Sequence, residues 1–464
     1  MSRVRRVGIV GGGISGLSAA YYLKKKSSQL QKALQIQVIE REKTLGGVIR
    51  SEQEGDFLLE WGPEGFVSYK QAAVRLVKEL GVGDELLGSN DYQRKNYVVL
   101  DGQLLAYPDG MAFLSPVRLS SFWRTAPLSL RGKLRVFLEP FISPSNGDLS
   151  VSEFFERRLG REFTERLVEP MVGAIYAANI NELSTVSALP EMRSIEQQYR
   201  SLWRGLRKRP LNGTRTGASA FLTLRAGMQR LVEALENALP DVEFLTGTEV
   251  LRVAHEADGR IKIETADFSS SYDYLIVTTP APVASRLLRD FHRELSARLG
   301  EILYSSSTLV YLAYPAGEVP HPLDGFGFIV SAAEAEVLDA CTWVHRKFDG
   351  RCPENFVLLR CAIHDGRRAR ESKSDDELIQ LVHEEMGRLL GVSCDPILTR
   401  VRHLGRALPK LLVGHSERLK QIRRMVDAYP ELVLSGAYYG GVGIPECISA
   451  GEAVADRILT RLDE

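Results

Sequence analysis

Three glycines and one acidic residue near the start of the chain have the spacing needed to bind a phosphate group. Gly11, Gly13 and Gly16 form the pattern GxGxxG, and Glu40 follows Gly16 after 24 residues. Gly11 permits a tight turn, Gly13 lets the backbone approach a pyrophosphate, and Gly16 lets a helix lie against a strand. The N–H groups at the start of that helix, where Ser15 lies, can bind the anion. Because the carboxylate of Glu40 can accept both hydroxyls of an adenosine ribose, these residues predict a dinucleotide site.

The elements around these glycines are the ones that such a site requires. Val7 to Val10 is a short apolar run, as in a central parallel strand, and apolar residues then recur every three or four positions from Ile14, as in a helix. A second strand pattern, Ile36 to Ile39, leads directly into the acid. The order of strand, glycine turn, helix, strand and acid favours a βαβ unit over a glycine-rich turn without a ligand.

The segment after Glu40 indicates which dinucleotide is bound. It begins with Arg41 and carries a second glycine pair, Gly46-Gly47, followed by Arg50. It resembles the second signature of FAD enzymes of the amine-oxidase and glutathione-reductase-like superfamily, in which the pair passes beside the diphosphate and flavin. Gly62-Pro63 resembles the segment that lies beside the isoalloxazine in the same families. The resemblance implies FAD as the cofactor, with these residues among its contacts.

The last part of the chain returns to the same site. Ile444 to Leu462 has the pattern of a helix, and a turn rich in glycine precedes it. The N–H groups at the start of this helix would face the pyrimidine end of the flavin and stabilise negative charge there. The superfamily resemblance implies further cofactor contacts from Val250, Thr278, Gly436, Gly443, Ile444 and Ile448.

Further segments narrow the resemblance to one family. They are Gly62 to Phe66, Tyr97 to Pro108, Gly173 to Ala177, Glu182 to Ser184, Gly325 to Phe328, Gly414-His415 and Cys447-Ile448. In order, and over essentially the whole chain, they resemble the oxygen-dependent, FAD-containing coproporphyrinogen III and protoporphyrinogen IX oxidases of haem biosynthesis. The implied activity is the six-electron oxidation of a porphyrinogen to a porphyrin by molecular oxygen. Since hydride goes to the flavin, no side chain is assigned as catalytic.

The family implies an α/β fold with α+β insertions and three domains. A discontinuous, Rossmann-like FAD-binding domain is expected from about 1–70, 225–290 and 400–464. A mixed-sheet substrate domain is expected from 70–90 and 290–400. A helical domain that faces the membrane and contributes to the substrate site is expected from 90–224.

Two positions bear on which porphyrinogen is oxidised. Lys70 matches a lysine of bacterial coproporphyrinogen-type relatives, whereas Asn96 stands where protoporphyrinogen-type relatives carry an arginine. Coproporphyrinogen III, with more propionates, is therefore slightly favoured, and protoporphyrinogen IX is the alternative. The family implies substrate contacts from Lys70, Asn96, Ile175, Phe326, Gly327 and Ile329.

Some residues depart from the family pattern and keep other functions open. His364-Asp365 stands where many relatives have a glycine pair, and Pro409-Lys410-Leu411 replaces a usual Pro-Gln-Tyr. An FAD amine oxidase shares the cofactor elements but usually has an aromatic wall where this chain has Ile444. A phytoene-desaturase-like enzyme and a flavoprotein that acts as a redox-sensing binding module are the remaining alternatives.

Composition excludes several other classes of function. The chain has 59 basic and 59 acidic residues, so it has no net charge to hold nucleic acid. Its five cysteines form no CxxC pair, which suits a reducing compartment such as the cytoplasm. The string His383-Glu384-Glu385 lacks the second histidine of a zinc motif, and no metal site is predicted.

A basic stretch that contains tryptophan, Arg200 to Arg209, suggests peripheral contact with an anionic membrane on its inner face. Apolar pairs at Phe122-Trp123, Phe137-Leu138 and Phe141-Ile142 lie in the same region. A solvated helix end is the alternative. A homodimer and contact with a downstream chelatase are further hypotheses.

Overall fold

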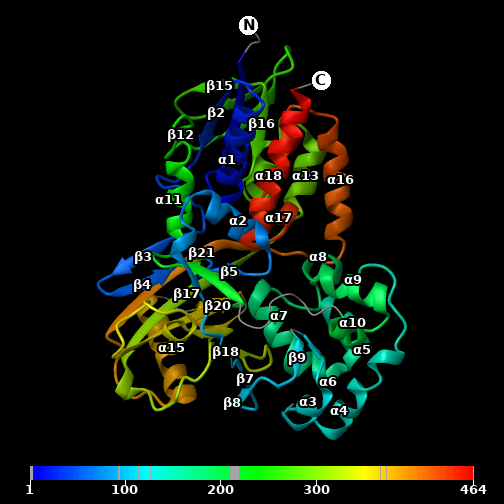
Figure 1. Ribbon diagram of the computed structural model, residues 1–464, viewed down its shortest axis with the longest axis vertical. Helices are drawn as coiled ribbons and strands as arrows, with labels where there is room; N and C mark the ends of the chain where they lie inside the picture. The colour runs from blue at the N-terminus through cyan, green and yellow to red at the C-terminus, as the bar shows by residue number, and fades with distance from the viewer. Residues whose placement is uncertain are drawn as a thin grey trace.

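The computed structural model describes residues 4–91, 95–112, 114–125, 127–208, 219–365, 367–371 and 374–462. Three bodies of secondary structure are visible in Figure 1: a parallel sheet with its helices at the top, a large sheet at the lower left and a group of helices at the lower right. Both chain termini lie at the top, on the parallel-sheet body. Arg209, the end of the expected basic stretch, is outside the described residues.

The upper body contains a five-stranded parallel sheet of order β12-β2-β1-β16-β22. Its strands are β1 (Arg5–Val10), β2 (Leu34–Ile39), β12 (Glu243–Leu245), β16 (Tyr274–Val277) and β22 (Leu432–Leu434). The expected strand–helix–strand unit is confirmed, with α1 (Ile14–Gln29) between β1 and β2. Side chains of β1 alternate between two cores: Val7 and Ile9 face one, and Val10 faces the other.

Helices and a small sheet cover the two faces of the parallel sheet. One core is formed with α1, α2 (Gln71–Glu79), α11 (Gln229–Asn237) and α18 (Ile444–Arg461). The other is formed with α12 (Ala281–Leu287), α13 (Arg293–Gly300), α16 (His415–Asp427) and α17 (Ala437–Gly440). A three-stranded antiparallel sheet completes it, with β13 (Arg252–His255), β14 (Ile261–Glu264) and β15 (Ser269–Tyr272). Each face is therefore buried, as a parallel sheet requires.

The second body is a seven-stranded mixed sheet of order β21-β17-β20-β19-β18-β7-β8. Its strands are β7 (Tyr97–Leu100), β8 (Gln103–Ala106), β17 (Tyr304–Pro315), β18 (Gly327–Val330), β19 (Ala340–Trp343), β20 (Phe356–His364) and β21 (Leu398–Pro409). One face packs against α15 (Asp375–Leu390), and the other packs partly against the hairpin of β3 (Ser51–Glu54) and β4 (Phe57–Glu60). Short helices α14 (Val344–Lys347), η5 (Ala316–Glu318) and η6 (Arg368–Glu371) connect its strands.

The third body is built from short helices around a core that contains Phe122, Phe154, Phe155 and Phe163. Its helices are α3 (Leu119–Thr125), α4 (Leu130–Val136), η3 (Glu139–Phe141), α5 (Val151–Leu159), α6 (Arg161–Phe163), η4 (Thr164–Val168), α7 (Glu169–Tyr176), α8 (Thr185–Ala188), α9 (Pro190–Tyr199) and α10 (Leu202–Lys208). The two-stranded ladder of β9 (Met111–Ala112) and β10 (Ser115–Pro116) adjoins them. Among the described helices, none is long and apolar enough to span a membrane.

Three expected boundaries are wrong in detail. The segment 70–90 was expected in the substrate domain, but α2 buries Ala73, Leu76 and Val77 in the parallel-sheet core. These residues are three and four positions apart, so they form one apolar stripe that packs between neighbouring helices. Strands β7 and β8, at the start of the expected helical domain, instead belong to the seven-stranded sheet. Strand β21, at the start of the last expected FAD segment, belongs to it as well.

A small sheet links the bodies. It consists of β5 (Phe66–Val67), β11 (Phe221–Leu224) and β6 (Leu86–Gly88), and η1 (Gly83–Glu85) leads into β6. Because β5 leads into α2, this sheet fixes the loop that carries Lys70.

Candidate active site

The GxGxxG segment forms the turn between β1 and α1, and its glycines have different structural roles. Gly16 packs on Gly11 so closely that a Cβ at position 16 would lie 2.0 Å from the Gly11 carbonyl oxygen. A Cβ at Gly13 would meet nothing within 4 Å. Thr278, at the end of β16, donates from its hydroxyl to the Gly11 carbonyl at 3.0 Å. The turn is thus closed on the protein side and open at Gly13, as binding of a diphosphate requires.

The carboxylate of Glu40 is held by backbone amides. Its Oε2 accepts from Gly12 N at 2.7 Å, and its Oε1 accepts from Glu42 N at 2.8 Å. Each oxygen keeps a lone pair, so the carboxylate is oriented and can still accept from a ribose hydroxyl. Arg41 instead turns outward, and its guanidinium donates to the Glu42 side chain.

The second glycine pair lies beside the first turn. Gly46 N donates to the Gly12 carbonyl at 2.9 Å, and a bridge joins Gly13 to Gly46, which brings Gly47 alongside. Further along, the Gly62 carbonyl accepts from Arg360 Nη2 at 2.8 Å, immediately before Pro63. Arg360 comes from β20, so this contact ties the segment expected beside the flavin to the seven-stranded sheet.

Of the expected C-terminal cofactor residues, Gly443 is partly exposed, whereas Gly436, Ile444 and Ile448 are buried. Gly436 follows β22, and Gly443 is the N-cap of α18. The side chains of Ile444 and Ile448 are buried in the core with α1, and Ile448 has no exposed surface even without a ligand. The Ile448 side chain packs α18 against α1, and its contact with the cofactor stays a prediction.

Orphaned polar groups near the carboxyl ends of the strands support the fit to FAD. The N–H and C=O of Val250 make no hydrogen bond within the described part of the chain, so they are available to an adenine. The hydroxyls of Thr279 and Ser435, which follow β16 and β22, are buried without a partner among the described residues. Ligands of parallel α/β sheets bind at these strand ends. With the open Gly13 and the oriented Glu40, the residues present fit FAD.

Two of the expected substrate residues come from different bodies, Ile329 from the seven-stranded sheet and Ile175 from the helices. Ile329 pairs with Ala340, which pairs with Ala362, so one row of side chains crosses β18, β19 and β20. This row lies opposite the face that packs on α15, because Phe328 and Val330 belong to the α15 core. Ile175, on α7, is 45% exposed. The small alanines leave a flat surface beside Ile329.

Three expected substrate residues make backbone contacts within the protein. Phe326 is buried, and its carbonyl accepts from Trp343 N at 2.9 Å. A Cβ at Gly327, whose φ is 140°, would lie 2.0 Å from the Cys341 carbonyl oxygen. Glycine at 327 is thus required by the pairing of β18 with β19. Asn96 immediately precedes β7, and its carbonyl accepts from Tyr107 N at 2.8 Å.

Lys70 precedes α2 and contacts an unexpected partner. Its ammonium forms an ion pair with the carboxylate of Glu446 in the first turn of α18. Burial alone would lower the pKa of Lys70, but Glu446 outweighs burial and raises it, so the ammonium stays charged.

His364, Ala362 and Arg360 were not predicted as site residues. His364 Nε2 lies 3.3 Å from the Ala174 carbonyl oxygen, which joins β20 to α7 directly before Ile175. Burial lowers the pKa of His364, so its ring is neutral near pH 7, and Nε2 is the donor to that carbonyl. The replacement of a glycine pair at this position was the sequence signal that could have identified it.

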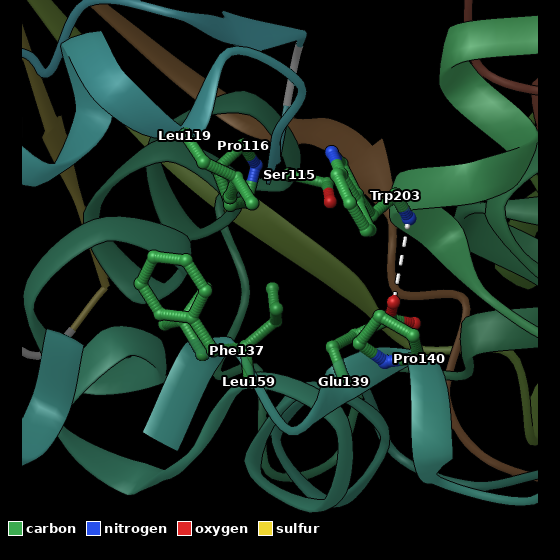
Figure 2. Close-up of a pocket in the computed structure, with 9 residues that line it drawn as sticks. Ser115, Pro116, Leu119, Phe137, Glu139, Pro140, Leu159 and Trp203 are labelled. Atoms are coloured by element: carbon green, nitrogen blue, oxygen red, sulfur yellow. Dashed lines mark hydrogen bonds between the residues drawn. The ribbon is translucent and has the colours of Figure 1, made fainter. Parts of the chain in front are cut away.

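A separate small cavity of about 70 Å³ lies within the helical body. Figure 2 shows it between Phe137 and Trp203, with a hydrogen bond from Trp203 N to Glu139 Oε2 at 3.5 Å. It is far below the roughly 300 to 1,000 Å³ of typical ligand pockets. This cavity is therefore not the substrate site.

Comparisons with known proteins cover the whole chain. The model of the family described as flavin containing amine oxidoreductase matches residues 14–459. A coproporphyrinogen III oxidase of Bacillus subtilis is 33% identical over 99% of this chain and 98% of its own length. A protoporphyrinogen oxidase of Bos taurus is 29% identical over 98% of each. A crystal structure from Exiguobacterium sp., assigned as a protoporphyrinogen oxidase, matches with a TM-score of 0.87 at 29% identity over 100% of both chains.

Proposed function

The chain belongs to the flavin-containing amine oxidoreductases, and within them to the porphyrinogen oxidases, and from this premise we propose that it oxidises coproporphyrinogen III to coproporphyrin III in haem biosynthesis. Protoporphyrinogen IX is the alternative substrate. The observation that carries the proposal is the similarity to a coproporphyrinogen III oxidase over almost the full length of both chains. A charged lysine at position 70 supports the substrate with more carboxylates.

The cofactor is FAD, which when bound accepts hydride from the substrate and passes the electrons to O2. The turn at Gly11 to Gly16 would receive its diphosphate, because the helix N-terminus and the open Gly13 favour an anion there. Glu40 would hold the ribose through the oxygen lone pairs that its amide contacts leave free. The backbone of Val250 would face the adenine.

The substrate would lie between the seven-stranded sheet, at the row that contains Ile329, and α7, at Ile175. The row of Ile329, Ala340 and Ala362 offers a flat, apolar surface for a macrocycle, and Ile175 on α7 adds an exposed apolar side chain. The Lys70 ammonium would bind a propionate. No side chain is required as a strong base, because an electron-rich porphyrinogen loses hydride from a bridging carbon and a proton from a pyrrole nitrogen.

We propose a functional role for each of the three bodies, from the proposed positions of FAD and substrate. The parallel-sheet body with α1, α2, α11 and α18 would hold FAD, and the seven-stranded sheet would bind substrate. The helical body would face the membrane. This membrane-facing role is supported by an apolar surface on α4 and the turn after it. The surface is formed by the exposed side chains of Leu130, Leu134, Leu138 and Phe141.

We also propose peripheral attachment at the inner face of a cytoplasmic membrane, and that surface supports it. The four apolar residues are four, four and three positions apart, so they share one side of α4 and the turn after it. Arg131 on α4, and Arg204 and Arg207 on α10, supply basic groups in the same body. Apolar insertion with basic flanks is the pattern of an interfacial helix. A homodimer and contact with a downstream chelatase are further parts of the proposal.

The experiment is a comparison of substrates at matched flavin content. Purified protein reconstituted with FAD is given coproporphyrinogen III, protoporphyrinogen IX, amines and a carotenoid precursor, and O2 consumption and porphyrin fluorescence are followed. Highest kcat/KM with coproporphyrinogen III supports the proposal. Preference for protoporphyrinogen IX selects the alternative, and turnover of an amine alone refutes both.

A further inference from the structure

Lys70 and Glu446 are joined across two elements that meet at the centre of the molecule. Lys70 is the N-cap residue of α2, and Glu446 is the third residue of α18. Their side chains are 36% and 23% exposed, so the pair is half-buried and still accessible to a ligand. The Lys70 ammonium also lies 5.8 Å from the centre of the Tyr69 ring.

Glu446 is fixed more firmly than Lys70. It belongs to an 18-residue helix that packs along α1 and α2, as Figure 1 shows. Its side chain folds back over the glycine turn before the helix: a Cβ at Gly443 would lie 2.4 Å from Glu446 Oε2, and one at Gly441 would lie 2.8 Å from its Cγ. A carboxylate at this position is stabilised by the helix dipole. The position of the carboxylate is therefore set by the backbone around it.

The pair lies close to the helical body. Burial, and after it the charge of Glu446, raises the pKa of Tyr176 on α7. Tyr176 follows Ile175, and its hydroxyl donates to the Ala188 carbonyl at 2.5 Å. Val442, in the turn before α18, and Tyr176 both pack against the core of the helical body, so the Lys70–Glu446 pair lies where the parallel-sheet body meets the helices.

We propose that Glu446 is a positioning residue that holds the Lys70 ammonium ready for a carboxylate of the substrate. A lysine ammonium has three donors on a flexible stem, and Glu446 engages one of them. Two donors are left for a propionate, and the stem is already ordered before the substrate binds. Preorganisation of this kind improves binding by reducing the entropy lost on association. The inference rests on the proposed function and extends it to a residue outside the substrate contacts.

The test compares Glu446→Gln with a matched control. Glu446→Gln removes the charge and keeps the size. It should raise the KM for coproporphyrinogen III about fivefold or more and leave kcat within about twofold, because ground-state binding is weakened. Glu446→Asp, which keeps the charge, should stay nearer the wild-type KM. The control is Glu452→Gln, which breaks an ion pair with Arg75 between the same two helices, and its KM should not change.

A double-mutant cycle separates positioning from a structural role. If Glu446 acts through Lys70, Lys70→Ala and the double variant Lys70→Ala/Glu446→Gln should have the same KM. An unchanged or lower KM in Glu446→Gln, an equal rise in Glu452→Gln, or additive effects in the double variant would overturn the inference.

Direct binding distinguishes failure of this inference from failure of the proposed function. Coproporphyrin III is titrated into each variant, and the quenching of its fluorescence is followed. A wild type that binds coproporphyrin but oxidises no porphyrinogen refutes the proposed function alone. In that case weaker binding by Glu446→Gln still supports the positioning role, and equal binding by wild type and variant overturns it.

Discussion

Gly16 packs directly on Gly11, and the space for a Cβ at position 16 is already filled by the Gly11 carbonyl oxygen at 2.0 Å. Gly13, between them, is different: a Cβ at position 13 would meet no other atom within 4 Å. Two glycines of one motif therefore serve different purposes. Gly16 is required by the contact of protein with protein, and Gly13 leaves room for a ligand.

This difference predicts opposite behaviour of two variants. Gly13 has φ −75° and ψ 177°, a conformation open to other residues, so Gly13→Leu should fold normally and lose FAD because its side chain fills the diphosphate space. Gly16→Ala should destabilise the apoprotein itself by about 1 to 3 kcal/mol, as overpacking does. Thermal unfolding of the apoproteins and the flavin absorbance after reconstitution measure the two effects. Full flavin content in Gly13→Leu would contradict the assigned cofactor site.

Glu60 gives a prediction about pH. Burial raises its pKa from 4.5 to about 7, and its carboxylate accepts from Met228 N and the Ser51 hydroxyl. A raised folded-state pKa means that the stability contributed by the protonated form is complete below about pH 4.5 and is lost as pH rises through 7. Wild type should therefore lose roughly 2 to 3 kcal/mol relative to Glu60→Gln between pH 5 and pH 8.

Unfolding midpoints of both proteins across that range check this prediction. The midpoint of Glu60→Gln should exceed that of wild type at pH 8 and approach it at pH 5. Parallel pH profiles of the two proteins would show that Glu60 does not titrate in this window.

The local parts of the fold and site could be predicted from the sequence, whereas the long-range parts could not. The β1 turn, Glu40 and the helix after Ile444 are encoded by short patterns whose spacing carries the geometry. The pairing of Lys70 with Glu446 joins residues 376 positions apart, and no local pattern marks it. Similarly, Ile448 fits a motif of cofactor-binding enzymes, but its burial against α1 depends on how two distant helices cross.

The wrong domain boundary at β21 has a related cause. Its sequence, Leu398 to Pro409, is rich in arginine and contains Gly405, so it does not have the alternation of a half-buried strand. It is nevertheless an edge strand of the seven-stranded sheet, paired with β17 over most of its length. Edge strands tolerate charged side chains because one side of the backbone faces solvent.

Arg158 is expected to be essential for stability of the helical body. Its guanidinium contacts Glu139 at 2.7 Å and Glu196 at 2.9 Å, and all three side chains are almost completely buried. Arg158→Met would leave the buried carboxylate of Glu139 without an ion-pair partner among the described residues and would remove one of the cations beside Glu196, so it should cost about 3 to 5 kcal/mol. The matched control is Arg161→Met, which removes an exposed pair with Glu165 and should change little. Chemical denaturation of both variants compares them, and an effect of Arg158→Met as small as that of Arg161→Met would contradict the prediction.

Lys70→Ala tests the choice of substrate. A charge-assisted hydrogen bond is worth about 1.5 to 3 kcal/mol, so kcat/KM for coproporphyrinogen III should fall about ten- to a hundredfold. The fall for protoporphyrinogen IX should be smaller, because it has fewer propionates to place. Porphyrin fluorescence with each substrate measures both ratios. Equal losses for the two substrates would show that Lys70 does not select between them.

The apolar surface of α4 predicts binding to vesicles. Leu134 and Phe141 are 55% and 79% exposed, so Leu134→Ser/Phe141→Ser should keep the fold and reduce partition onto anionic vesicles. Each apolar side chain contributes about 1.5 to 3 kcal/mol when fully buried, and a lipid interface buries part of it. The control is Leu303→Ser/Ile397→Ser, which removes side chains that are 53% and 51% exposed in the other bodies. Sedimentation with vesicles of increasing anionic lipid, at low and high salt, separates the contributions of basic and apolar side chains to binding. The contribution of the basic side chains should weaken with salt, and that of the apolar side chains should not. If both double variants bind like wild type, this surface is not a membrane contact.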